Sequence, residues 1–130
     1  MAERIVCTYC GMDGHRASRC PTRAKESKIE KHLVRRVKEL GGEVRKVQWV
    51  GRRNAPDRLA LIPARVRSWI NLDRRVNHCI WVELKNPETI KTFPANAHER
   101  AQAREHQRMR ELGQRVEVIG TIEGVEELLA

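Results

Sequence analysis

Long apolar runs and aromatic side chains are both scarce in this sequence. The longest aliphatic stretches, such as LALI at 59–62, are only as long as a strand, and one Phe and one Tyr accompany three Trp in 130 residues. A membrane-spanning helix needs about 20 apolar residues, so the sequence excludes a helical membrane protein. Hydrophobic residues still make up 40% of the chain, which is enough for one modest core.

Acidic residues are also in short supply. Asp and Glu number 17 against 26 Lys and Arg, which gives a formal net charge of +9. Such a surplus on a short chain favours a polyanionic partner, with nucleic acid ahead of an anionic membrane. The basic residues are spread along the chain without an accompanying apolar segment, so we expect a nucleic-acid partner and no membrane.

A secretory leader is not evident. The start, MAERIVCTYC, has no apolar core region and no small-residue cleavage site. We therefore expect a cytoplasmic protein that is not secreted and keeps its thiols reduced. Of only four cysteines, three lie within residues 7–20, and this crowding favours a metal site over two disulfides.

The N-terminal cysteines follow a metal-binding pattern. Their C-x2-C-x4-H-x4-C spacing places four ligands together: Cys7, Cys10, His15 and Cys20. Two thiolates separated by two residues can hold one ion from a tight turn, while an imidazole and a third thiolate complete a tetrahedron suited to Zn²⁺. The pattern predicts one structural zinc ion in a small domain at residues 1–21.

This segment resembles a known module. With Tyr9 between the first two cysteines and Gly14 before the histidine, it is similar to the CCHC zinc knuckle of nucleocapsid-type proteins. The resemblance implies single-stranded nucleic-acid binding, in which exposed residues of the knuckle stack on unpaired bases, with Tyr9 as a candidate. The charge of Arg16 would suit a phosphate, or it lies on a solvated surface. A purely structural zinc module that stiffens the N-terminus is the alternative.

The rest of the chain alternates between helical and extended patterns. Apolar residues at helical spacing, runs of alternating polarity, and Gly or Pro punctuation predict helices at 27–40, 97–112 and 125–130 and strands at 43–50, 57–63, 79–85 and 115–120. Residues 22–26 are expected to form a linker, and 64–78 a basic excursion. The order predicts an α/β domain at 27–130 with a mixed four-stranded sheet flanked by helices.

Two carboxylates and a lysine are expected at neighbouring strand ends. Asp57 opens the second strand, and Glu83 and Lys85 share one face at the end of the third. The carboxylates and the main-chain carbonyl of Leu84 would supply oxygen ligands for Mg²⁺ or Mn²⁺, with Lys85 beside the attacking water. An ordinary ion pair at a strand end is the alternative.

These residues also carry a family resemblance. APD at 55–57 and ELK at 83–85 resemble the PD-(D/E)xK nuclease signature. The virus-type replication-repair nuclease domain, VRR-NUC, is similar over residues 26–130, on the segments ESKIE at 26–30, GGEVRKV at 41–47, GRRNAPDRLALIP at 51–63, WVELK at 81–85, Gln102 and MRELGQRVEVI at 109–119. The resemblance implies a restriction-endonuclease-like core and a metal-dependent endonuclease.

The resemblance also implies roles for single residues. It assigns metal ligation to Asp57 and Glu83, catalysis to Lys85, and supporting positions at or near the site to Glu30, Lys46 and Gln102. Ser27-x-x-Glu30 is equally a capping box, Gln107 competes with Gln102, and Lys46 is alternatively a solvated charge. The remaining histidines, His106 among them, show no ligand spacing.

Basic residues suggest how nucleic acid would be held. Arg52 and Arg53 lie on a predicted loop, and Arg100 and Arg104 form a stripe on the second helix; each could contact phosphate, or lie on a solvated surface. The resemblance implies DNA rather than RNA, branched or junction structures, a phage or bacterial replication, recombination or repair setting, and a homodimer as one option. The rival is a non-catalytic nucleic-acid-binding protein on a nuclease-like fold.

Overall fold

The computed structural model describes residues 5–7, 13–14, 16, 21–63 and 79–130. Its elements are, in chain order, α1 (Pro21–Glu39), β1 (Glu43–Lys46), β2 (Arg58–Leu61), β3 (Cys79–Leu84), the 3-10 helix η2 (Ile90–Thr92), α2 (Ala97–Glu111), β4 (Arg115–Ile119) and α3 (Ile122–Leu129). The predicted order of helices and strands is confirmed, with η2 as an addition. The predicted excursion at 64–78 lies outside the described residues.

The four strands form one mixed sheet in the order β1-β2-β3-β4. β1 pairs with β2 and β2 with β3 in antiparallel fashion, so the first three strands form the predicted meander. β4 then pairs in parallel with β3. A parallel neighbour requires a crossover connection, and the segment that contains η2 and α2 provides it.

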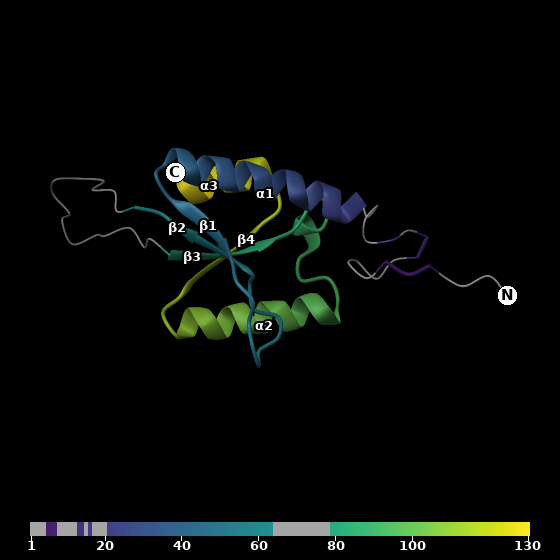
Figure 1. The fold of residues 1–130 in the computed structure, drawn as a ribbon. Helices are drawn as coiled ribbons and strands as arrows, with labels where there is room; N and C mark the ends of the chain where they lie inside the picture. Colours follow the sequence, from purple (N-terminus) through teal and green to yellow (C-terminus); the bar gives the residue numbers. More distant parts are fainter. Residues whose placement is uncertain (1–4, 8–12, 15, 17–20, 64–78) are drawn as a thin grey trace.

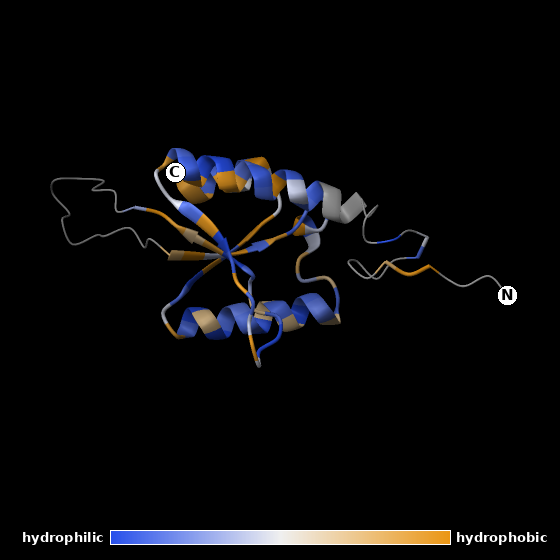
Figure 2. Cartoon of the chain, viewed as in Figure 1, coloured by the Kyte–Doolittle hydropathy of each residue, from blue (hydrophilic) through white to orange (hydrophobic). Residues whose placement is uncertain are grey.

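The helices lie in two layers on opposite faces of the sheet. α1 and α3 cover one face and α2 covers the other (Figure 1). The apolar core lies on the α1 side, where Leu33 and Val37 pack against Ala60, Ile80 and Val82. Figure 2 shows that α2 is mostly hydrophilic, whereas α3 and the central strands carry many hydrophobic residues. The layer between α2 and the sheet is therefore the more polar of the two.

Within the described ranges, no helix combines the length and apolar character that crossing a bilayer requires.

The first helix begins earlier than predicted. It starts at Pro21, so residues 22–26 are helical and the predicted linker is wrong. Proline is favoured at the first helical position, because its missing N–H would have no helical partner there, and no helix breaker follows before Gly41. Ser27 consequently lies inside the helix, which also overturns the capping-box interpretation of Glu30.

Two other boundaries differ from the prediction by more than two residues. β1 ends at Lys46 instead of continuing to residue 50, because the chain turns into a loop in which the indole Nε1 of Trp49 donates to the carbonyl of Pro56 at 2.8 Å. α3 begins at Ile122 because the hydroxyl of Thr121 accepts a hydrogen bond from the N–H of Gly124 at 2.9 Å. A side-chain cap of this kind fixes a helix start independently of the apolar pattern.

Candidate active site

The start of β2 and the end of β3 meet at one edge of the sheet. Arg58 lies opposite Val82 in the antiparallel register, so the preceding residue, Asp57, lies opposite Glu83. Side chains directly opposite in such a pair project from the same face, which here is the face that α2 covers. The Glu83 side chain is 12% exposed and that of Asp57 is 60% exposed. The two carboxylates thus lie on one face, one sheltered and one open to solvent.

Gln102 joins Glu83 to Lys85. Its Nε2 donates to Oε1 of Glu83 at 2.8 Å, and its Oε1 accepts from Nζ of Lys85 at 2.9 Å. Gln102 and Lys85 are both buried, so these charge-assisted bonds lie largely out of water and hold both side chains in place. The competing residue, Gln107, lies on the exposed side of α2.

Glu99 is a third carboxylate in this cluster. Its Oε2 lies 3.3 Å from Nζ of Lys85, and its Oε1 accepts a hydrogen bond from the N–H of Ala95 at 2.9 Å. The backbone N–H of Glu99 in turn donates to Oδ1 of Asn96. The sequence analysis did not single out Glu99, although the pattern Asn96-x-x-Glu99 is a recognisable helix-start signal.

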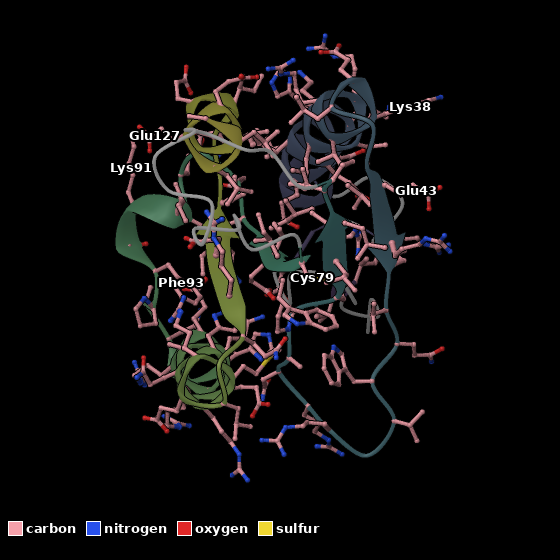
Figure 3. All side chains as sticks on the ribbon, turned by 90° about the vertical axis from the view of Figure 1, so that its left-hand side faces the viewer. Lys38, Glu43, Cys79, Lys91, Phe93 and Glu127 are labelled. Atoms are coloured by element: carbon pink, nitrogen blue, oxygen red, sulfur yellow. The ribbon has the colours of Figure 1, made fainter. Side chains whose placement is uncertain are left out.

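Aromatic and imidazole rings close the cluster on its inner side. The ring of Phe93, on the segment between η2 and α2 (Figure 3), lies 5.2 Å from Nζ of Lys85 and stacks at 6.1 Å on His106. His106 is 1% exposed, and its Nε2 lies 3.7 Å from Oε2 of Glu83. Neither ring nitrogen has a hydrogen-bond partner in the described part of the chain. His106 is a second residue that the sequence reasoning missed; its position one turn after Gln102 was the available signal.

Arg58 links Asp57 to the first helix. Its Nη1 lies 2.9 Å from Oδ2 of Asp57, and its Nε donates to Oε1 of Glu30 at 2.9 Å. Burial lowers the pKa of Arg58, but the hydrogen bond to Glu30 and the charges of both carboxylates outweigh burial and raise it above its ordinary value. Glu30 therefore reaches the same edge of the sheet from the α1 side, and its described contacts lead to Arg58 and not to Glu83.

Lys46 and Asp57 border one open cavity of about 520 Å³. Trp49, Arg52 and Asn54 also line it. Lys46 lies opposite Arg58 in the β1–β2 register. Its side chain therefore projects from the face of the sheet that carries Arg58 and not from the face that carries Asp57 and Glu83. The structure therefore puts Lys46 next to Asp57 but outside the hydrogen-bonded cluster around Gln102.

The residues predicted to contact nucleic acid are only partly described. The exposed members are Arg16, Arg52, Arg53, Arg100 and Arg104, whereas Tyr9 lies outside the described residues. Arg52 forms an ion pair with Glu105 on α2, with Nη2 and Oε2 2.8 Å apart. The hydrogen bond from Arg52 lowers the pKa of Glu105 below its ordinary value, and the pair connects this loop to α2.

Of the four predicted zinc ligands, only Cys7 is described, and it is buried. Cys10, His15 and Cys20 lie outside the described residues. Val6 forms a bridge with Asp13, and the N–H of Gly14 donates to the carbonyl of Ile5 at 3.0 Å. These two contacts place residues 5 and 6 beside residues 13 and 14.

The described residues contain no group of three or more His, Cys, Asp or Glu side chains arranged around a common metal position. At the sheet edge, the available hard donors are the carboxylates of Asp57 and Glu83 and the main-chain carbonyl of Leu84. Mg²⁺ is commonly held by one or two carboxylates and keeps several waters. The donor chemistry at this edge therefore fits a magnesium-type ion.

No family model matches the chain. The chain is 37% identical over 95 residues to "Putative nuclease p44" of Acyrthosiphon pisum secondary endosymbiont phage 1, an alignment that covers 73% of this chain and 82% of that protein. A solved structure described as a VRR_NUC domain superposes with a TM-score of 0.58 at 32% identity, and the match covers 81% of this chain and 94% of that one. Both similarities extend over most of the chain.

Proposed function

Since the chain belongs to the VRR-NUC family of nucleases, we propose that it hydrolyses phosphodiester bonds in DNA at the sheet edge formed by Asp57, Glu83 and Lys85. The observation that carries this proposal is the amide of Gln102, which bonds to both Glu83 and Lys85. An ordinary surface ion pair does not need a buried amide between its partners. Such an amide instead holds a carboxylate and an amine at a fixed separation.

A divalent metal is part of the proposal. Asp57, Glu83 and the carbonyl of Leu84 would hold Mg²⁺ or Mn²⁺ and leave room for water. When bound, such an ion polarises phosphoryl oxygens and makes water more acidic. Arg58 would hold the carboxylate of Asp57 in position, because its guanidinium pairs with Oδ2.

The remaining chemistry falls to Lys85 and the groups around it. Its Nζ would orient the attacking water and offset negative charge that develops on the phosphate in the transition state. Nζ donates a hydrogen bond to Gln102 and lies close to the carboxylate of Glu99 and the ring of Phe93. A group fixed in this way needs little reorganisation during the reaction, which is the basis of electrostatic catalysis.

The substrate is proposed to be branched or junction DNA, in a phage or bacterial replication, recombination or repair setting. The exposed side chains of Arg53, Arg100 and Arg104 would contact phosphates on either side of the site. A homodimer would present two such sites to the arms of a junction. These features rest on the family and on the charge of the chain.

The test is cleavage of a panel of labelled nucleic acids. Single-stranded, duplex, flapped and four-way-junction DNAs, with RNA counterparts, are incubated with the full chain in Mg²⁺, Mn²⁺, Ca²⁺ or EDTA. We expect cutting in Mg²⁺ or Mn²⁺, none in EDTA, and the highest rate on a branched DNA. Tight binding without cleavage of any DNA or RNA in either metal would instead identify a non-catalytic nucleic-acid-binding protein.

Zinc is proposed to be held by Cys7, Cys10, His15 and Cys20, in a knuckle that helps to bind DNA. We expect about one zinc per chain when metal content is measured by mass spectrometry, and its loss in Cys7→Ser. Cys79→Ser is the matched control, because Cys79 is exposed at the start of β3. Equal zinc content in the two variants would show that Cys7 is not a zinc ligand and would overturn the proposal.

A further inference from the structure

The loop that joins β1 to β2 is held in a defined shape. It extends past the sheet and runs beside α2 (Figures 1 and 3). The indole of Trp49 is bonded to Pro56, Arg52 is paired with Glu105 of α2, and Val47 donates its N–H to the carbonyl of Asp57 at 2.9 Å. These contacts fix the loop at its base and along its length. The cavity on the inner side of the loop therefore has its shape before any ligand binds.

The cavity lining combines an aromatic face, positive charge and an amide. Trp49 contributes the aromatic face, Lys46 and Arg52 the cations, and Asn54 the amide, while Asp57 lies at the border. Lys46 has no ion-pair partner among the described residues, so its charge is available to a ligand. The volume of about 520 Å³ lies within the range of pockets that take small ligands.

A single unpaired nucleotide matches this lining. A nucleobase presents a π face for stacking and polar edges for an amide, and its phosphate is an anion for a lysine. A base inside a duplex cannot stack on Trp49, because its neighbours already cover both of its faces. The indole of Trp49 itself packs against that of Trp81, with ring centroids 5.0 Å apart.

We infer that this cavity is a binding site for one unpaired nucleotide of the substrate strand, with its base on Trp49 and its phosphate toward the cationic residues of the lining, Lys46 and Arg52. The inference rests on the proposed function, because Asp57 joins the cavity to the proposed reaction centre. The bound nucleotide would neighbour the scissile phosphate. The enzyme would thereby recognise the unpaired nucleotide at a branch point without reading its sequence, since every base has a face that can stack.

The test combines protein variants with abasic DNA. Dissociation constants are measured in EDTA, where no cutting occurs, on a flapped DNA that carries a tetrahydrofuran abasic residue at each position around the branch in turn. For the wild-type chain, loss of the base at one position should weaken binding about tenfold. Trp49→Leu should weaken binding to intact DNA by a similar factor and become insensitive to the abasic residue at that position.

Two further variants keep this result interpretable. Trp49→Phe retains an aromatic face and should restore most of the abasic sensitivity, which a merely structural role for the indole would not predict. Val50→Ser is the matched control, because Val50 neighbours Trp49 on the same loop, is 95% exposed and does not line the cavity. It should bind both DNAs as the wild type does.

The outcomes separate this inference from the proposed function. If Trp49→Leu and wild type lose the same factor on abasic DNA, or if no abasic position affects the wild type, the nucleotide site is overturned even when the protein cuts DNA. If abasic sensitivity depends on Trp49 but no nucleic acid is cut in Mg²⁺ or Mn²⁺, the nucleotide site stands and the nuclease proposal fails.

Discussion

Glu83→Gln is expected to bind branched DNA normally and to cut it at least about a thousandfold more slowly. The substitution removes one of the two carboxylates proposed to hold the metal. A bound metal ion lowers the reaction barrier by several kcal/mol, so its loss slows cleavage strongly. Gln is nearly isosteric with Glu, and its amide oxygen can still accept the hydrogen bond that Gln102 donates to Oε1. The fold should therefore be preserved.

The matched control for this variant is Glu117→Gln. Glu117 lies on β4 of the same sheet, its side chain is 45% exposed, and its ion-pair partner, Arg115, lies 3.5 Å away on the same strand. Single-turnover cleavage in Mg²⁺ and DNA binding in EDTA are measured for both variants. A Glu83→Gln rate within tenfold of wild type would show that this carboxylate does not hold an essential metal.

Lys85→Met is expected to lose both activity and stability, for different reasons. Without Nζ, cleavage should fall by about a hundredfold to a thousandfold, as when one transition-state donor is removed from an active site. The carboxylate of Glu99 would also lose its buried cation, and breaking a buried pair by removing one partner costs about 3 kcal/mol or more. A low rate from this variant alone could therefore reflect partial unfolding.

The double variant Lys85→Met/Glu99→Gln separates the two effects. Neutralising Glu99 removes the unpaired buried charge, while Gln at this position can still accept the hydrogen bond from Ala95. Urea unfolding should show that most of the lost stability returns, whereas the cleavage rate should stay as low as in Lys85→Met. If cleavage recovered along with stability, the role of Lys85 would be structural.

Strand order and helix order were predictable because apolar spacing and turn residues mark them locally. The meander and the crossover then followed from connection lengths. The start of α1 was not predictable in this way, because residues 22–26 contain no apolar stripe to reveal a helix. Their helical state follows from the favourable position of Pro21 and from continuity with the amphipathic segment.

The strand pattern placed Glu83 and Lys85 on one face and the resemblance added Gln102, and the structure brings these three side chains together; the other polar residues of α2 were not foreseen. The buried residues of α2 are Glu99, Gln102, His106 and Met109, which recur at the spacing of a core-facing helix stripe. Because three of the four are polar, a search for apolar periodicity assigns the stripe to solvent. The stripe becomes recognisable only when the facing side chains, Glu83 and Lys85, are known to need polar partners.

The parallel pairing of β3 with β4 has a consequence for the newly synthesised chain. The N–H of Lys85 donates to the carbonyl of Ile119 at 2.7 Å, so the backbone that carries the lysine is fixed by β4, which is synthesised after β3 and α2. A chain that ends before Arg115 already contains Glu83, Lys85 and Gln102, yet lacks the strand that fixes their geometry. Under the proposed function, incomplete copies of this protein would therefore not cut nucleic acid.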